Sequence, residues 1–140
     1  MGEVEVTLDA VAICHSDISY AEGAWGGHLP AVYGHEAAGV ITKLGAGVAG
    51  FTEGDSVVVT LIRACGNCPS CAGGKPTTCE TPYDSVNGPL KDADGSPLQQ
   101  AMACGAFAEK VVVDQRQIVK IPETIAKDVA SLVSCGVITG

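Results

Sequence analysis

Four cysteines that could bind a metal lie within fifteen residues of this 140-residue chain. Cys65, Cys68, Cys71 and Cys79 follow the spacing C-x2-C-x2-C-x7-C, and glycines between them allow the backbone to turn around a common centre. Four thiolates can bind one zinc ion tetrahedrally, at about 2.3 Å per bond. Because such a shell leaves no open coordination position, the spacing predicts a structural zinc site in a lobe at about residues 63–84.

The cluster fits a disulfide framework or simple apolar packing less well. The total of seven cysteines is odd, and the start, MGEVEVTLDA, is not a cationic and apolar leader, so neither feature favours a secreted disulfide framework. Cysteines that merely pack as small apolar groups would not explain so many thiols in a polar, glycine-rich stretch.

A second metal site could form from residues that lie far apart in the sequence. Cys14 in CHSD, His35 in GHE and Cys135 in SCG offer two thiolates and one imidazole. Three protein ligands with an open fourth position are typical of a catalytic zinc. Spacing alone does not decide the matter, because the fold must bring such ligands together, and His35 by itself could be a hydrogen-bonded interior histidine.

GAGVAG, at residues 45–50, spells G-x-G-x-x-G, the fingerprint of a dinucleotide-binding turn. That fingerprint opens a helix after a strand, whereas FTEGDSVVV follows here and indicates a turn and then another strand. The helix whose amide groups would hold the pyrophosphate is missing. We therefore interpret residues 45–50 as a glycine turn, and we expect this chain to show no high-affinity binding of NAD or NADP.

Composition excludes several classes of partner. Eight basic and sixteen acidic residues give a formal charge of -8, which opposes a polyanion-binding surface, so we expect no nucleic-acid partner. The apolar runs are far too short to span a membrane, and we expect no membrane association and a cytoplasmic location. The length fits one domain.

Hydrophobic patterning predicts a mainly β fold with a few short helices. One helix or turn is expected at residues 15–23 and a second helix at 122–136, where Pro122 could open it. The second helix is also indicated by apolar residues at helical spacing, namely Val129, Leu132 and Val133. The predicted strands cover residues 3–14, 37–44, 56–62, 107–114 and 117–121.

These motifs, taken together, resemble those of the zinc-containing alcohol dehydrogenases. GHEAAGVITKLGAGV is similar to the family signature, in which G-H-E is followed by two residues, Gly, five residues, Gly, two residues and an aliphatic side chain. CHSD and the four-cysteine lobe stand at the family's distances before and after it. The resemblance runs from VAICHSD to SCGVITG and implies the GroES-like catalytic domain of a medium-chain dehydrogenase/reductase, a partly open β-barrel with a zinc-binding lobe.

The resemblance also implies roles for the residues of the second metal site. Cys14, His35 and Cys135 would bind the catalytic zinc. Glu36 would lie beside the metal, able to approach it transiently. Asp17 would accept a hydrogen bond from His35 and so fix the orientation and tautomer of the imidazole.

Neighbouring residues would serve the substrate and the coenzyme. Ser16 would hydrogen-bond the alcohol and pass its proton outward, and His15 would lie next to the coenzyme phosphates, although it could also be a plain exposed histidine. Trp25 and Leu61 would shape the substrate pocket, unless they simply belong to the core. Some relatives continue the proton relay to a histidine where this chain has Ser19.

The implied function is oxidation of an alcohol, or reduction of an aldehyde or ketone, with hydride transfer to or from NAD or NADP. Its cofactors would be two zinc ions and, in the full-length enzyme, the nicotinamide coenzyme. A Rossmann domain would follow Gly140, so we expect residues 1–140 to be inactive alone and part of a larger dehydrogenase that forms a homo-oligomer. An aldehyde or formaldehyde-adduct reductase fits as well, and the alternative from another class is a non-catalytic zinc-binding β module.

Overall fold

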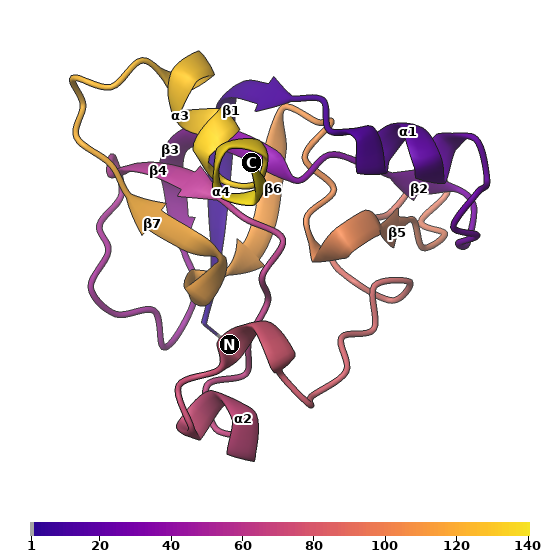
Figure 1. Ribbon diagram of the computed structural model, residues 1–140, viewed down its shortest axis with the longest axis horizontal. Helices are drawn as coiled ribbons and strands as arrows, with labels where there is room; N and C mark the ends of the chain where they lie inside the picture. The colour runs from indigo at the N-terminus through magenta and orange to yellow at the C-terminus, as the bar shows by residue number, and fades with distance from the viewer. Residues whose placement is uncertain (1) are drawn as a thin grey trace.

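An open antiparallel sheet organises the computed structural model, which describes residues 2–140 (Figure 1). The strands of the chain are β1 (Glu3–Ala12), β2 (Ala31–Val32), β3 (Glu36–Leu44), β4 (Ser56–Val59), β5 (Gln99–Gln100), β6 (Lys110–Asp114) and β7 (Ile118–Lys120). Five of them form the main sheet in the order β6-β1-β3-β4-β7, and each neighbouring pair is antiparallel. The other two, β2 and β5, pair in parallel as a separate small sheet.

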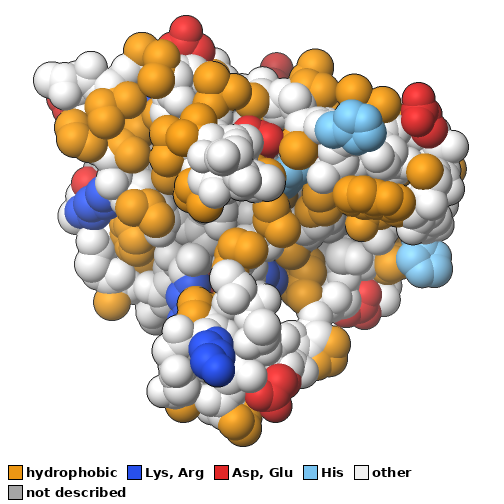
Figure 2. Space-filling model, in the orientation of Figure 1, with side chains coloured by type: hydrophobic (Ala, Val, Ile, Leu, Met, Phe, Trp, Pro, Cys, Tyr) orange, Lys and Arg blue, Asp and Glu red, His pale blue; other side chains and the backbone are white. Residues whose placement is uncertain are grey.

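Short helices connect the strands and cover part of the sheet. They are α1 (His15–Ala21), α2 (Pro69–Ala72), α3 (Lys127–Val133) and α4 (Gly136–Thr139), with 3₁₀ turns η1 (Pro76–Thr78), η2 (Ala101–Ala103) and η3 (Gln115–Gln117). Helix α3 packs on β1, β3 and β4, whereas α2 lies in a lobe that projects away from the sheet (Figures 1 and 2). None of these helices is long and apolar enough to cross a membrane. The predicted fold class, mainly β with short helices, is confirmed.

Small aliphatic side chains fill the core. Alternation along β1 buries Val4 and Val6, as expected for a strand with one face on the core. The core cluster contains Val4, Val6, Ala37, Ile41, Val57, Val59, Cys104, Ala106, Val111, Val113 and Ile118. These buried residues include no aromatic side chain, although the partly buried Phe51 packs against them.

Several predicted strands are present but shorter than expected. β4 ends at Val59, because the following residues turn toward the lobe: the Ile62 N–H donates to the Thr60 hydroxyl, and the next N–H bonds locally as well. The strand predicted at residues 107–114 begins only at Lys110, since the Phe107 N–H donates to a carbonyl before β3 instead of joining the sheet.

The predicted helix over residues 122–136 is wrong in its start and its continuity. Pro122 lies in a turn, α3 begins five residues later, and the helical path breaks at Cys135 before α4. Ala130, rather than a large side chain, is buried against β3 and β4, and its small size lets α3 approach the sheet closely. The residues whose spacing predicts the helix lie on its exposed side: Val129, Leu132 and Val133.

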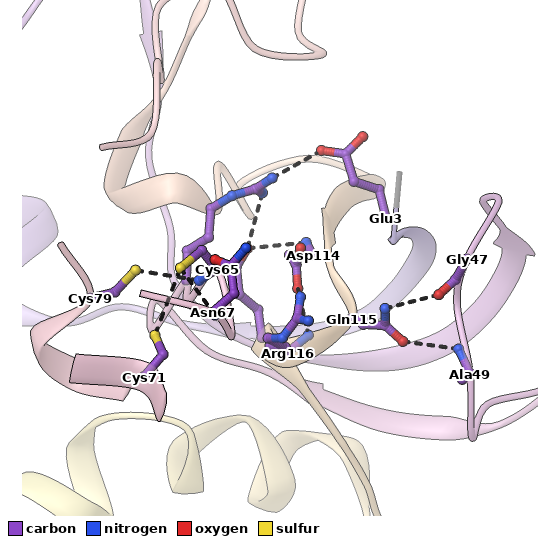
Figure 3. A network of polar contacts seen from close by, with 12 residues as sticks. Glu3, Gly47, Ala49, Cys65, Asn67, Cys71, Cys79, Asp114, Gln115 and Arg116 are labelled. Carbon is purple, nitrogen blue, oxygen red and sulfur yellow. Dashed lines mark hydrogen bonds and ion pairs between the residues drawn. The ribbon is translucent and has the colours of Figure 1, made fainter. Parts of the chain in front are cut away.

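The glycine turn at residues 45–50 is confirmed, and a contact from η3 explains its structural role. The Gln115 Nε2 donates to the Gly47 carbonyl at 3.2 Å, and the Gln115 Oε1 accepts from the Ala49 N–H at 2.9 Å (Figure 3). Gly47 and Gly50 have φ angles of 82° and 80°, which suit glycine. The turn joins β3 directly to β4 and opens no helix.

Candidate metal centres

Two groups of possible metal ligands occur within the described residues 2–140. The first is the predicted four-cysteine group, whose Sγ atoms all lie within 4.8 Å of one another. The Cys65 and Cys71 sulfurs are 4.0 Å apart (Figure 3). Four sulfurs bound at about 2.3 Å to one tetrahedral zinc ion lie about 3.8 Å apart, so this donor set fits zinc closely. All four cysteines are free thiols.

Local turns in the lobe direct its thiols inward. Cys68 caps the N-terminus of α2, where Pro69 takes a first-turn position and the Cys71 N–H donates to the Cys68 sulfur at 3.5 Å. The Cys65 sulfur likewise accepts the Cys68 N–H at 3.3 Å. Such N–H···S bonds favour the thiolate, the form that binds metal.

The thiols of the lobe differ in pKa. A hydrogen bond with the Thr81 side chain, followed by two backbone N–H groups, lowers the pKa of Cys65 to about 6. The Gly66 N–H lowers the pKa of Cys71, but desolvation and the three neighbouring thiols outweigh it and raise that pKa to about 12. Close thiols cannot all ionise without a compensating charge. A bound cation would remove that conflict.

Two arginines attach the lobe to the sheet. Arg116 lies against Gly66, where an added Cβ would come within 2.6 Å of the Arg116 Nε, and its guanidinium bonds to Asp114 at 3.4 Å. Arg63, at the start of the lobe, bonds to Glu3 at 3.2 Å. The lobe is therefore fixed near its base, while its sulfur donors all come from one local segment.

The second group joins residues from opposite ends of the chain. Cys14, His35, Glu36 and Cys135 each place a ligand atom within 4.8 Å of the others. Cys14 precedes α1, His35 and Glu36 lie where β3 begins, and Cys135 separates α3 from α4. His35 and Glu36 are buried, whereas both thiols are half-buried. The structure thus brings together the three ligands that the sequence suggests, with the Glu36 carboxylate among them.

Asp17 connects the two segments that carry Cys14 and His35. One Asp17 oxygen accepts the Cys14 N–H at 3.0 Å; the other accepts the Gly34 N–H at 3.0 Å and lies 3.3 Å from the His35 Nδ1. Asp17 is only 4% exposed. With Nδ1 occupied by this carboxylate, the His35 Nε2 remains to face a metal.

The segment around Cys135 is held against β3. The Gly136 N–H donates to the Glu36 Oε2 at 3.2 Å, which ties the start of α4 to the ligand group. Burial raises the pKa of Cys135, and the nearby Cys14 and Glu36 raise it further. Binding a metal through this thiol must therefore release a proton.

The remaining predicted site residues differ in their burial and contacts. The Ser16 hydroxyl is 3.7 Å from the Cys14 sulfur, at the edge of the ligand set. His15 is exposed, and its Nδ1 lies 3.2 Å from the hydroxyl of the buried Ser19. Leu61 is half-buried after β4. Trp25 is 58% exposed and packs edge-on against an aromatic ring of α1.

Sequence reasoning missed a tight contact beside His35. Gly34 has a φ of 91°, and an added Cβ would lie 2.7 Å from the Phe107 N and 2.8 Å from its ring. Only glycine fits this position, which sets the path of the chain into His35. The glycine of GHE could have indicated a constrained backbone position, but nothing near it in the sequence indicates that Phe107 packs against it.

Comparison with known proteins agrees with this architecture. The family model described as the alcohol dehydrogenase GroES-like domain matches residues 1–123. A putative alcohol dehydrogenase D from Mycobacterium tuberculosis is 35% identical over 145 residues, which cover 99% of this chain and 39% of that relative.

Solved structures share the fold over almost the whole chain. The alcohol dehydrogenase zinc-binding domain protein from Burkholderia ambifaria has a TM-score of 0.88 and 32% identity over 97% of this chain and 39% of its own. Benzyl alcohol dehydrogenase from Acinetobacter calcoaceticus has a TM-score of 0.86 and 28% identity over 100% of this chain and 39% of its own. The chain thus spans about 39% of the length of these relatives. It belongs to the family of alcohol dehydrogenase GroES-like domains.

Proposed function

We propose that this chain is the catalytic domain of a zinc-dependent dehydrogenase that oxidises alcohols or reduces the corresponding aldehydes or ketones. The observation that carries the proposal is the convergence of Cys14, His35, Glu36 and Cys135 within 4.8 Å. Two thiolates and one imidazole are a known ligand set of catalytic zinc, and they leave one position free. Family membership supports the same function.

The two metal centres would have different roles. The four-cysteine group has a closed set of sulfur donors and would hold a structural zinc. A zinc ion at the Cys14, His35 and Cys135 site would supply Lewis acidity toward a hydroxyl or carbonyl oxygen. Both thiols there are half-buried, so this site is not closed off from solvent.

The residues around this site would orient the ligands and move the proton. Asp17 would hold the His35 ring through Nδ1, at the 3.3 Å observed, and stabilise the backbone on either side. Ser16, beside the Cys14 sulfur, would accept the proton of the substrate hydroxyl. Glu36 would remain near the metal while its carboxylate accepts the Gly136 N–H.

The coenzyme would be NAD or NADP, and it would bind mainly outside residues 2–140, because the sheet described here is antiparallel and the glycine turn opens no helix. His15, exposed and held by Ser19, would contact the coenzyme phosphates. We further propose that the complete protein is a homo-oligomer.

Cobalt substitution tests the proposed function directly in this chain. A cobalt ion bound by two thiolates and one imidazole should give a visible spectrum that changes when ethanol is added, because the fourth position is open. The same chain carrying Cys135→Ser should lose this response. If cobalt gives only the spectrum of a closed four-sulfur site, the proposal fails and a non-catalytic zinc-binding β module is the better description.

A further inference from the structure

Two glutamine side chains lie in the interior of this protein, where apolar side chains are the rule. Gln100, in β5 (Figure 1), and Gln117, at the end of η3, are both 0% exposed. Burying an amide costs free energy unless its N–H and C=O groups are hydrogen-bonded, and an apolar side chain of similar volume has no such cost. Filling space in the core therefore does not explain these two residues.

Gln100 joins three segments of the chain through its amide group. Its Nε2 donates to the Cys104 carbonyl and to the Val112 carbonyl, each at 2.8 Å, and its Oε1 accepts the Tyr83 hydroxyl. Val112 lies in β6, whereas Tyr83 lies near the end of the lobe. Both N–H groups and the oxygen are thus bonded, and the segment that contains Cys104 is tied to two others.

Gln117 makes a similar set of bonds, one of them to the residue before Cys104. Its Nε2 donates to the Ala103 carbonyl at 2.9 Å and to the Thr60 carbonyl at 3.0 Å. Its Oε1 accepts a backbone N–H of β6 at 3.1 Å and an Arg63 N–H at 3.3 Å. The two glutamines therefore hold the carbonyls of two consecutive residues. A buried polar network in which every group is bonded specifies one arrangement of its segments.

These carbonyls belong to a strained turn, residues 101–105, which we call the η2 turn because it begins with η2. Met102 and Ala103 have φ angles of 52° and 54°, and no other non-glycine residue in the described part of the chain has a positive φ. A left-handed backbone is unfavourable for residues that carry a Cβ, and it persists only where surrounding contacts determine it. The side-chain amides of the two glutamines supply such contacts.

The η2 turn leads directly to the residues that set the path of the chain into His35. The Ala106 N–H donates to the Gly34 carbonyl at 2.8 Å. The next N–H, that of Phe107, donates to the Tyr33 carbonyl at the same distance. The Phe107 N is also the atom that an added Cβ at Gly34 would meet at 2.7 Å. A shift of the turn would therefore move both residues that precede His35.

We propose that Gln100 and Gln117 are positioning residues of the His35 centre, the metal site formed by Cys14, His35 and Cys135. By holding the η2 turn in its left-handed conformation, they fix the two N–H groups that bind the residues before His35, and so keep its imidazole within reach of the two thiols. The inference rests on the metal-binding part of the proposed function. It adds two residues that belong to neither ligand group.

Methionine in place of either glutamine tests the two amide donors. Gln100→Met and Gln117→Met keep an unbranched side chain of similar length but leave a carbonyl of the η2 turn without its donor. A smaller fraction of the chains would then hold His35 in the binding position. We expect the zinc affinity of the His35 centre, measured by competition with a chelator, to fall about three- to tenfold, while the lobe keeps its affinity.

Amide hydrogen exchange follows the η2 turn without any metal. In Gln100→Met and Gln117→Met, the N–H groups of Ala106 and Phe107 should exchange about tenfold faster than in the unmodified chain, because the turn that presents them opens more often. The N–H groups in the middle of β1 should exchange at an unchanged rate.

Two further variants separate positioning from a general loss of stability. Val4→Ala removes buried apolar volume where Val4 pairs with Leu44, at the opposite end of β3 from Glu36. It should lower the free energy of unfolding without changing either zinc affinity. Ala103→Gly lets the turn adopt a positive φ without the penalty of a Cβ. Added to Gln117→Met, it should restore part of the zinc affinity of the His35 centre.

The outcomes separate this inference from the proposed function. An unchanged zinc affinity in both methionine variants, or an equal fall in Val4→Ala, would overturn the inference. A fall that Ala103→Gly does not relieve would overturn it too, because the glutamines would then not act through the turn. If the unmodified chain binds metal at the His35 centre but its cobalt spectrum does not respond to ethanol, the proposed function fails, and the methionine variants still decide the inference. A chain that binds no metal there would contradict both.

Discussion

The two candidate metal centres of this molecule are built in opposite ways. The lobe takes all its donors from the fifteen residues between Cys65 and Cys79, and short turns direct them inward. The other centre takes Cys14, His35 and Cys135 from both ends of the chain, and only the folded sheet with α1 and α3 brings them together. One centre is therefore local, and the other depends on the whole domain.

Each centre is consequently vulnerable at different residues. Damage to a lobe cysteine removes a ligand but leaves the sheet and its core intact, because the lobe projects from them (Figure 1). The second centre responds instead to changes at residues that bind no metal, such as Asp17 and Gly34, since these hold the ligand segments in place. Single substitutions should therefore affect one centre and spare the other.

Loss of one lobe ligand should have the largest effect. We expect Cys79→Ser to reduce bound zinc from two ions per chain to one and to make residues 63–84 sensitive to proteases, because a structural zinc contributes on the order of 10 kcal/mol to the folding of a small metal-bound unit. Metal analysis and limited proteolysis measure both effects.

Cys104→Ala is the matched control for that experiment. Cys104 is fully buried, donates to the Thr60 carbonyl at 3.2 Å, and has a pKa raised to about 12 by desolvation. It belongs to neither ligand group, so this variant should keep both zinc ions. An equal loss of zinc in the two variants would show that the lobe is not an independent centre.

The second-largest effect should come from Gly34, which sets the path of the chain into His35. Gly34→Ala places a side chain at a φ of 91° and within 2.7 Å of the Phe107 N. The backbone conformation costs about 1–2 kcal/mol, and the overlap adds about 1–3 kcal/mol. We expect a large fall in the free energy of unfolding, measured in urea, and loss of metal from the His35 centre.

Gly54→Ala separates the cost of the backbone conformation from the cost of the overlap. Gly54 has nearly the same φ, 92°, but an added Cβ there would meet nothing within 4 Å. This variant should lose only the conformational part, about 1–2 kcal/mol, and should keep both metals. If the two alanine variants were equally stable, the contact between Gly34 and Phe107 would not determine the position of His35.

The contrast between the centres also explains what the sequence could reveal. The lobe was predictable from spacing, because donors three to eight residues apart meet through local turns alone. For the second centre, the residues alone did not decide whether His35 is a metal ligand or a hydrogen-bonded interior histidine. The resemblance to a family supplied the ligand set, because local sequence patterns do not predict that Cys135 lies near Cys14. Asp17 was assigned from the same resemblance, and its position against His35 agrees with it.

The fold was predictable in class but not in its details. Alternation and apolar runs located the five strands of the main sheet, yet β2 and β5 have two residues each and too little pattern to be recognised. The apolar spacing near the C-terminus indicated a helix but not its buried side, because Ala130 rather than the larger residues faces the sheet.

Removal of the charge of Asp17 should have a smaller effect, on the zinc affinity of the His35 centre. Asp17→Asn keeps an oxygen that can accept a backbone N–H but loses the carboxylate that faces the His35 Nδ1 at 3.3 Å. We expect the zinc affinity of that centre to fall about 10- to 100-fold, as for other groups that orient a metal-bound histidine. The lobe should be unaffected. Asp84→Asn, which changes an exposed carboxylate at the last residue of the lobe, should leave both affinities unchanged. A fall in either affinity would point to a general loss of stability.

The smallest effect should be the difference in zinc retention between the two intact centres. The sheet already holds Cys14 and His35 together through Asp17, so only the Cys135 end of that centre can loosen. It is held by Ala130 and by the bond between Gly136 and Glu36, but Val137 and Ile138 after it are 62% and 74% exposed, and a segment with so little buried apolar area opens readily. The lobe instead takes all four donors from one short segment. We expect the lobe to keep its zinc to about tenfold higher chelator concentration, a difference of about 1.4 kcal/mol. Stepwise chelation with metal analysis measures this difference, and the variants Cys79→Ser and Cys135→Ser identify which zinc ion leaves first. If the His35 centre kept its zinc longer, the exposed segment after Cys135 would not limit its zinc retention.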